Sequence, residues 1–281
     1  MSDLHQFDIH SFNQAAMATH FQVRIHCDER TYAAQAAQAA FDLVNSLEAR
    51  LSRFRSNSDI ARIADLAPGE KMRLSEPAFA CLQIAARMER ATHGAFCATP
   101  AALKTQSSLP QWSLLPDEQS ILCVTGQLQF DLGAIGKGFA LDRMAELLRQ
   151  WDCPSFLLIA GGSSVLAGDP PAEAPGWSCG LGEDHASQRF LLAHGSLSGS
   201  GLAVQGSHIL DPRNGRPAAR QMRAWALADT AAESDALSTA CMVLSESEVE
   251  EVLAQDHSWL SFLETDEGYR SLGRRVPPIQ S

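Results

Sequence analysis

The sequence predicts an α+β protein, because short segments of alternating polar and apolar residues lie among separate segments with apolar residues at helical spacing. The two kinds of segment do not alternate regularly, as they would in a doubly wound α/β protein. The 281 residues are 45% hydrophobic, which is enough for a sizeable core, and no repeat or low-complexity tract divides them. We therefore expect one domain over residues 1–281.

The first part of the chain predicts a strand followed by three helices. Residues 21–25 alternate as a half-buried strand does, and an alanine-rich helix follows, with an apolar face formed by Ala40, Val44, Leu47 and Leu51. The polar loop 51–59 offers a cap for a short helix at Asn57, Ser58 or Asp59. Ser75 is expected to cap a longer helix that stops near Gly94.

The later segments are less regular. From about residue 99 to 115 the chain is rich in Pro, Ser and Gln, which predicts a surface excursion, and strands resume at Ile121. Residues 157–159 form a short apolar run, and a glycine-serine stretch follows at 196–201. From about Gly268 onward we expect a loosely attached extension.

The turn at residues 131–138, Asp-Leu-Gly-Ala-Ile-Gly-Lys-Gly, is the most informative motif. Leu128 and Phe130 before it alternate as in a short strand, and apolar residues at helical spacing follow it. The N–H groups at such a strand-to-helix turn, together with Lys137, favour an anion such as a phosphate. The motif is neither of the familiar phosphate loops, so a simple tight turn with a solvated lysine is the alternative.

Two further sites could carry chemistry. Asp235 is expected to open a helix, with the Thr239 hydroxyl four residues later on the same side, which suits a hard cation such as magnesium. A carboxylate that interacts with the helix dipole, beside a packed threonine, is the alternative. His208 is the candidate general base, because histidine accepts a proton near neutral pH, although a structural histidine would look the same in the sequence.

Composition excludes several classes of protein. The formal net charge of -11 argues against a nucleic-acid partner, which would require a basic face. The seven cysteines are dispersed and include no C-x-x-C pair, which argues against a zinc knuckle or a disulfide framework and suits a reducing compartment. No export signal and no membrane-spanning segment is apparent, so we expect a cytoplasmic protein.

Taken in order, the motifs resemble those of the FAD:protein FMN transferase family, or ApbE family, over most of the chain. The segments that carry the resemblance are 17–19, 51–55 with 57–58, 94–96, 131–138, 160–162, 208–217 and 235–239. The resemblance implies an ApbE-like fold of mixed or antiparallel sheets packed with helices. It also implies magnesium-dependent transfer of FMN from FAD to a threonine or serine of an acceptor flavoprotein, with release of AMP.

The resemblance also implies roles for individual residues. Magnesium would be held by Asp235, Thr239 and the Ala134 carbonyl with help from Ser238, and His208 would activate the acceptor hydroxyl. Contacts to FAD would come from Met17, Ser52, Arg53, Phe54, Ala95, Phe96, Cys97, Asp131, Lys137, Gly161, Gly162, Ile209, Leu210 and Asp211.

The sequence departs from the family pattern at two places. Cys97 stands where the family usually has an aspartate after Gly-Ala-Phe, and the segment before His208 is shorter than usual. An FAD pyrophosphatase that uses water in place of an acceptor, and a flavin-binding protein without activity, are therefore the alternative functions.

Overall fold

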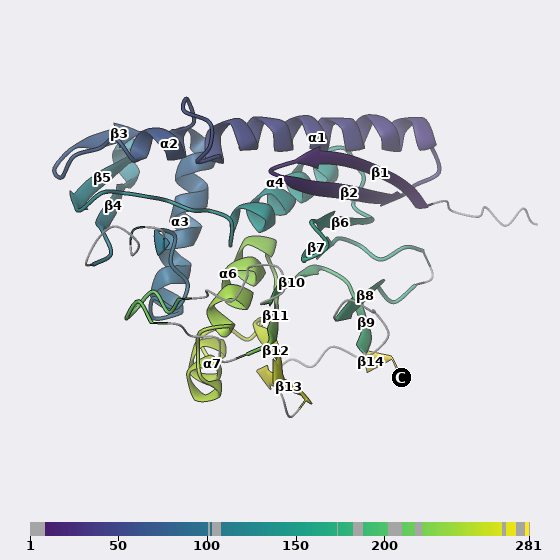
Figure 1. The fold of residues 1–281 in the computed structure, drawn as a ribbon. Helices are drawn as coiled ribbons and strands as arrows, with labels where there is room; N and C mark the ends of the chain where they lie inside the picture. The colour runs from purple at the N-terminus through teal and green to yellow at the C-terminus, as the bar shows by residue number, and fades with distance from the viewer. Residues whose placement is uncertain are drawn as a thin grey trace, which may run out of the picture.

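The structure is a computed structural model that describes residues 9–100, 102, 108–172, 174–181, 188–201, 210–216, 221–265, 268–273 and 279–280. Its centre is an eight-stranded sheet in which every neighbouring pair of strands is antiparallel (Figure 1). In sheet order the strands are β1 (Ile9–Ala16), β2 (Thr19–His26), β6 (Phe156–Ala160), β7 (Ser164–Ala167), β10 (Gly195–Gly201), β11 (Arg223–Ala228), β12 (Leu260–Thr265) and β13 (Gly268–Gly273).

Two smaller antiparallel sheets flank this one. They consist of β14 (Ile279–Gln280), β9 (Gln188–Leu192) and β8 (Trp177–Leu181), and of β3 (Lys71–Arg73), β5 (Ser120–Thr125) and β4 (Gln111–Leu115). The helices are α1 (Arg30–Leu51), α2 (Asp59–Ile63), α3 (Glu76–Ala91), α4 (Gly136–Gln150), α6 (Ala231–Cys241) and α7 (Glu246–Leu253), with a 3-10 turn η2 (Pro116–Glu118). The α+β prediction is confirmed.

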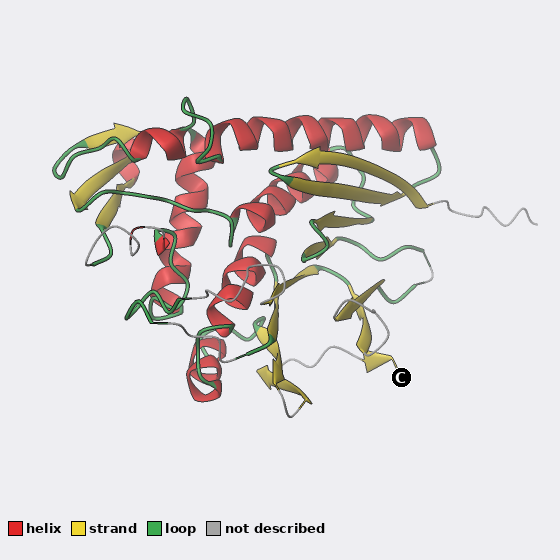
Figure 2. Cartoon of the chain, viewed as in Figure 1, coloured by secondary structure: helices red, strands yellow, loops and turns green. Residues whose placement is uncertain are grey.

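The middle of the large sheet is buried on both faces. Helix α4 packs against β6 and β7, helices α6 and α7 lie on one side of β10 to β13, and the β8–β9–β14 sheet lies on the other side (Figure 2). Along β6, Leu158 packs in the core cluster beneath the helices, whereas Leu157 packs in the cluster beneath the small sheet. This two-sided burial explains why the segment 157–159 is continuously apolar.

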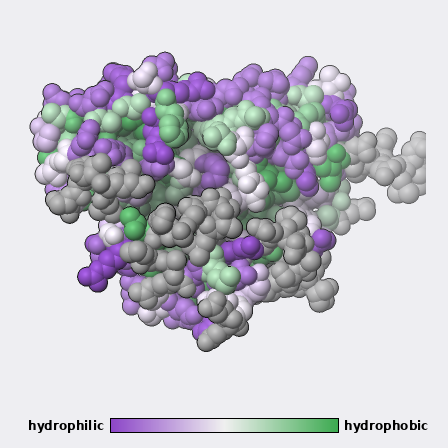
Figure 3. Space-filling view, in the orientation of Figure 1, coloured by the Kyte–Doolittle hydropathy of each residue, from purple (hydrophilic) through white to green (hydrophobic). Residues whose placement is uncertain are grey.

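Helix α1 covers the β1–β2 hairpin and buries a single face (Figure 1). Its buried residues recur every three or four positions, as an amphipathic helix requires: Ala33, Ala36, Ala37, Ala40, Phe41, Val44, Leu47 and Leu51. Hydrophilic residues dominate its outer side in the space-filling view (Figure 3). The predicted helix and its apolar face are thus confirmed.

The two predicted caps behave differently. The Ser58 side chain accepts a hydrogen bond from Ala61 N at 2.9 Å and caps α2 as expected. Ser75 occupies the N-cap position of α3, but its hydroxyl donates to Asp59 Oδ2 at 2.5 Å and makes no side-chain cap bond. The prediction for Ser75 is therefore right in position and wrong in contact, because a carboxylate of the neighbouring helix is the stronger acceptor.

Two local predictions are wrong, and a third, the surface excursion, holds only in part. Leu128 and Phe130 form no strand; both are buried in irregular backbone, with Phe130 packed edge-on against Trp112. The expected surface excursion ends in strand β4, which pairs with β5. The stretch from Gly268 is not a loose extension where it is described, because β13 pairs with β12 along its whole length and β14 pairs with β9.

Among the residues that the structure describes, no helix combines the length and the apolar character needed to cross a membrane. The assignment of the whole chain to one domain stays a prediction.

Candidate active site

Two adjoining cavities share the glycine-lysine turn, and the smaller one is also lined by α6. The larger cavity, of about 210 Å³, is lined by six of the predicted residues: Met17, Ser52, Arg53, Phe54, Asp131 and Lys137. Sequence reasoning did not assign its other lining residues, which are Ala18, Glu48, Leu51, Leu132, Gly133 and Gly136. The smaller cavity, of about 60 Å³, contains all four predicted metal ligands, Ala134, Asp235, Ser238 and Thr239. Gly133 and Lys137 line both cavities, so a single ligand can reach from one to the other.

The turn that precedes α4 supplies a cation and few free amides. Lys137 Nζ donates to the Gly133 carbonyl at 3.2 Å and lies 3.9 Å from Asp235 Oδ2. The amide of Gly136 is bonded to the Leu132 carbonyl at 2.6 Å, and the amide of Gly138 is bonded to Asp235. The turn therefore attracts an anion mainly through the Lys137 ammonium, rather than through a nest of exposed N–H groups as the sequence suggested.

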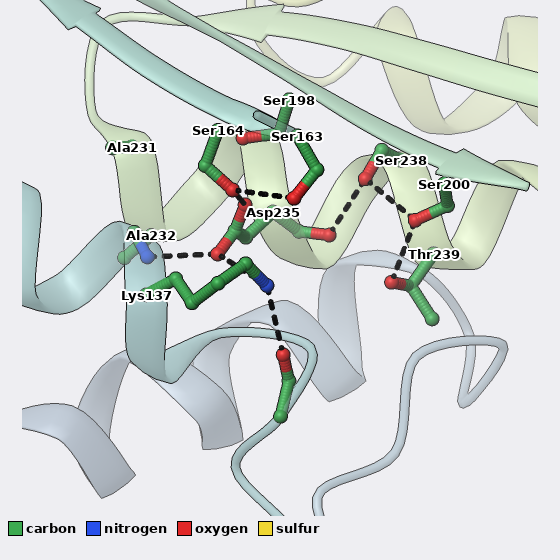
Figure 4. Close-up of polar contacts among 12 residues, drawn as sticks. Lys137, Ser163, Ser164, Ser198, Ser200, Ala231, Ala232, Asp235, Ser238 and Thr239 are labelled. Carbon is green, nitrogen blue, oxygen red and sulfur yellow. Dashed lines mark hydrogen bonds and ion pairs between the residues drawn. The ribbon is translucent and has the colours of Figure 1, made fainter. Parts of the chain in front are cut away.

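Asp235 lies at the centre of the smaller cavity (Figure 4). It belongs to the second turn of α6, which begins at Ala231 with Thr230 as its cap, so the prediction that Asp235 opens the helix is wrong by one turn. Its side chain is 4% exposed; Oδ2 accepts from Gly138 N at 2.7 Å and Oδ1 accepts from the Ser164 hydroxyl at 2.6 Å. Both donors are neutral, so the carboxylate charge is held in place but is not neutralised by them.

Gly138 is required at this contact. A β-carbon at Gly138 would lie 2.0 Å from the Ala231 carbonyl oxygen, which belongs to the backbone of α6. Only glycine allows the start of α4 to approach α6 this closely. The same approach brings the Gly138 amide within bonding distance of Asp235.

A row of hydroxyls extends from Asp235 along the same cavity (Figure 4). Ser238 Oγ donates to the Asp235 carbonyl at 3.0 Å, and Ser200 Oγ lies 3.0 Å from Ser238 Oγ and 3.2 Å from Thr239 Oγ1. Sequence reasoning missed Ser200. The alternation of Ser196, Ser198 and Ser200 was a usable signal, because alternate residues of a strand share one face.

The oxygen atoms of the smaller cavity fit a hard cation. Each Asp235 oxygen accepts one hydrogen bond and retains lone pairs, and Thr239 and Ala134 line the same cavity. Within the described part of the chain, no three His, Cys, Asp or Glu residues are grouped as metal ligands, so a zinc-type cage is not formed there. One carboxylate with neutral oxygens suits a cation that keeps water and phosphate ligands, as magnesium does.

The mouth of the larger cavity carries an exposed aromatic ring. Phe54 is 82% exposed, the Arg53 guanidinium lies 4.6 Å from the centre of its ring, and Arg53 Nη2 is 3.4 Å from Asp131 Oδ2. On the opposite hairpin, Met17 and Ala18 have φ angles of +50° and +56°, the left-handed values of a tight two-residue turn. An exposed ring beside a guanidinium is suited to stack on a flat aromatic ligand.

The Gly-Ala-Phe-Cys loop is linked to the larger cavity through the backbone bond between Ala98 and Asp131. Ala95 and Phe96 are buried in the core, and neither they nor Cys97 line the two cavities. Burial raises the pKa of the Cys97 thiol to about 11, with Glu89 adding to the effect, so the thiol is protonated and unreactive at neutral pH. The Glu89 carboxylate accepts from Ala98 N at 2.6 Å, and the Ala98 carbonyl accepts from Asp131 N at 2.8 Å.

The remaining predicted residues lie elsewhere or outside the described residues. Gly161 has a φ of +60°, and a β-carbon there would lie 2.6 Å from Thr19 Oγ1; neither Gly161 nor Gly162 lines the two cavities. Leu210 forms an isolated bridge, and the buried Asp211 is bonded to Arg213. His208 and Ile209 lie outside the described residues.

Comparisons with known proteins agree with this fold. The model of the ApbE family matches residues 17–262. An FAD:protein FMN transferase from Klebsiella pneumoniae is 24% identical over an alignment of 244 positions that covers 74% of each chain. One from Escherichia coli is 27% identical over an alignment of 143 positions that covers 46% of this chain and 40% of the relative.

Solved structures share the fold. The flavinyl transferase ApbE from Pseudomonas stutzeri superposes with a TM-score of 0.81 at 20% identity, over 96% of this chain and 97% of that one. The ApbE protein from Thermotoga maritima superposes with a TM-score of 0.80 at 21% identity, over 94% and 97%. Because the family model spans most of the chain, this protein belongs to the ApbE family.

Proposed function

We propose that this protein is a magnesium-dependent FAD:protein FMN transferase, which moves FMN from FAD to a threonine or serine of an acceptor flavoprotein and releases AMP. The curated relatives are named for this transfer. The observation that carries the proposal is the meeting of the Asp235 carboxylate, the Thr239 hydroxyl and the Lys137 ammonium at one small cavity, next to a larger cavity with an exposed ring.

The roles follow from the chemistry of a pyrophosphate. The acceptor oxygen forms a bond to the phosphorus of FMN, the bond from that phosphorus to the AMP oxygen breaks, and the acceptor proton passes to His208, the base that the family resemblance suggests. Lys137 neutralises part of the negative charge on the phosphates. Asp235, Thr239, Ser238 and the Ala134 carbonyl would hold magnesium, which when bound supplies further positive charge to the phosphate oxygens.

The flavin end of FAD is assigned to the larger cavity. Phe54 offers its exposed face to the ring system, and Arg53 and Asp131 supply polar contacts at the mouth. Met17 closes the cavity from the β1–β2 turn. Gly161, Gly162, Leu210 and Asp211 stay predictions from the family resemblance. A cytoplasmic location and the absence of a nucleic-acid partner stay predictions from the sequence and its net charge.

The test is incubation of the purified protein with FAD, magnesium and a candidate acceptor flavoprotein, with chromatography for AMP and mass spectrometry for bound FMN. Transfer requires that AMP release depends on the acceptor and that the acceptor gains the mass of one FMN. Asp235→Asn and His208→Ala should abolish both signals. Asp117→Asn, which changes an exposed carboxylate in η2, is the matched control and should retain both.

The same experiment separates the alternatives. AMP and FMN released without acceptor would indicate a pyrophosphatase, because water would then be the nucleophile. FAD that binds and stays intact under all conditions would indicate a binding protein. Either outcome would contradict the transferase proposal.

A further inference from the structure

Three hydroxyls and one carbonyl form a continuous chain at the smaller cavity (Figure 4). Thr239 Oγ1 lies 3.2 Å from Ser200 Oγ, and Ser200 Oγ lies 3.0 Å from Ser238 Oγ. Ser238 Oγ in turn lies 3.0 Å from the Asp235 carbonyl oxygen. Three of the four members, Thr239, Ser238 and the Asp235 carbonyl, come from α6, and Ser200 comes from β10, so this hydrogen-bond chain exists only because the strand and the helix pack together.

Each hydroxyl has a single proton, and this fixes which atom donates in each bond of the hydrogen-bond chain. A carbonyl oxygen only accepts, so Ser238 must donate its single proton to Asp235. Ser238 can then only accept from Ser200, which uses the single proton of Ser200. Ser200 can then only accept from Thr239. When all three bonds form, one assignment of protons is possible.

This direction determines what Thr239 presents to the cavity. Its proton is directed at Ser200, so the remaining lone pairs of Oγ1 are left for the cavity that it lines. A cation binds a hydroxyl through such a lone pair and is repelled by a hydroxyl proton. A hydroxyl bound to a cation is also a stronger donor, which would strengthen the bond from Thr239 to Ser200.

We propose that Ser200 is a positioning residue for the metal site: it accepts the Thr239 proton and so keeps Thr239 in the orientation that binds a divalent cation. The proposal rests on the metal site of the proposed function. Ser200 is the one member of the chain contributed by β10, and its position is set by the sheet register, in which it lies opposite Ala224 of β11.

Ser198 provides a matched control on the same strand. It lies two residues before Ser200, on the same face, and its hydroxyl is 2.8 Å from Ser234 Oγ of α6. Ser198 is buried and does not line either cavity. Loss of its hydroxyl therefore removes a comparable contact between strand and helix without touching the chain that ends at Thr239.

The experiment measures binding of Mn²⁺ alone, by the loss of its free electron paramagnetic resonance signal, to wild type, Ser200→Ala, Ser200→Thr and Ser198→Ala. We expect Ser200→Ala to weaken Mn²⁺ binding about 10- to 100-fold, the range found for residues that orient metal ligands. Ser200→Thr, which keeps the hydroxyl, should restore binding, and Ser198→Ala should bind like wild type. In the transfer assay, Ser200→Ala should require more magnesium for half-maximal rate while kcat at saturating magnesium is retained.

Thermal melting tests whether each variant is folded. If Ser200→Ala does not fold, Mn²⁺ binding to Ser200→Thr still tests the proposal. Unchanged Mn²⁺ affinity in Ser200→Ala, or an equal loss in Ser198→Ala, would overturn the role of Ser200 even if wild type transfers FMN. Mn²⁺ binding that follows the expected pattern in a protein without transferase activity would overturn the proposed function and support the role of Ser200. Wild type that binds no Mn²⁺ would overturn both.

Discussion

Gly138→Ala tests whether α4 and α6 approach as closely as the site requires. The added β-carbon would lie 2.0 Å from the Ala231 carbonyl oxygen, and both atoms are attached to backbone. An ordinary carbon–oxygen contact needs about 3.3 Å, so the two helices would have to separate by more than about 1 Å. The bond from Gly138 N to Asp235, now 2.7 Å, would then be lost or severely weakened.

The expected loss of stability has two parts. Overpacking costs about 1–3 kcal/mol, and loss of a hydrogen bond to a charged group costs about 1.5–3 kcal/mol, so we expect roughly 3–5 kcal/mol together. For a chain of this size each 1 kcal/mol lowers the Tm by about 2–4 °C, which predicts a decrease of roughly 10 °C. Urea unfolding and thermal melting followed by circular dichroism measure both quantities.

Gly136→Ala is the control, because it lies two residues earlier and its β-carbon would meet only Leu132 Cβ at an ordinary 3.6 Å. Alanine is a better helix former than glycine by about 0.8–1 kcal/mol, so this variant should match or exceed wild type in stability. A Gly138→Ala protein that melts within about 2 °C of wild type would refute the close contact between α4 and α6.

Three other predictions concern the surroundings of the site. Phe54→Ala should leave the Tm unchanged, because the ring is 82% exposed. It should weaken FAD binding about tenfold in a flavin fluorescence titration, and an unchanged affinity would show that Phe54 is not part of the flavin site. Burial raises the pKa of Asp142 to about 7, so the native state keeps a proton that the unfolded state releases above about pH 4. The free energy of unfolding should therefore fall as the pH rises from about 4 to 7, and Asp142→Asn should flatten that dependence in urea unfolding at several pH values; an equal slope in both proteins would contradict the assignment. Glu89→Ala should lower the free energy of unfolding by about 1–3 kcal/mol in urea, because the buried Ala98 amide loses its acceptor. Glu89→Gln keeps an acceptor oxygen and should lower it less. Equal decreases in both variants would show that the carboxylate does not act through this bond.

The periodicity of apolar residues predicts a helix or strand correctly where that element packs against the core on one face. The strand at residues 21–25 and the alanine-rich helix could be predicted because one side of each is fully buried and the other is less buried. The same alternation misled at Leu128 and Phe130, where the backbone is irregular although both side chains reach the core. Alternation reports burial, and a strand also needs a neighbour with which to pair.

The site was predictable in part for the same reason. Asp235 and Thr239 are four residues apart on one helix, so their proximity follows from local geometry. Ser164 and Ser200 reach these residues from β7 and β10, across 71 and 39 positions of sequence. Only the order of the strands brings them there, and no pattern local to either serine contains that order.

Two buried aspartates differ in how closely a positive charge approaches them, and this difference supports the cation proposed at Asp235. Asp211 is 5% exposed, and although burial acts to raise its pKa, hydrogen bonds and the charge of Arg213 hold it below the ordinary value. Arg213 Nη2 lies 2.8 Å from Asp211 Oδ2, so this carboxylate already has its counter-ion.

Asp235 is equally buried, but its bonds come from the Gly138 amide and the Ser164 hydroxyl, which carry no charge. The Lys137 ammonium lies 3.9 Å away, which is too far for a hydrogen bond. The ion pair of Asp235 with Lys137 is therefore looser than that of Asp211 with Arg213, and a buried carboxylate is stabilised further by a closer cation. Because the smaller cavity adjoins Asp235 and is lined by further oxygen atoms, a divalent cation there would stabilise the folded protein and hold the phosphates of FAD with the same charge.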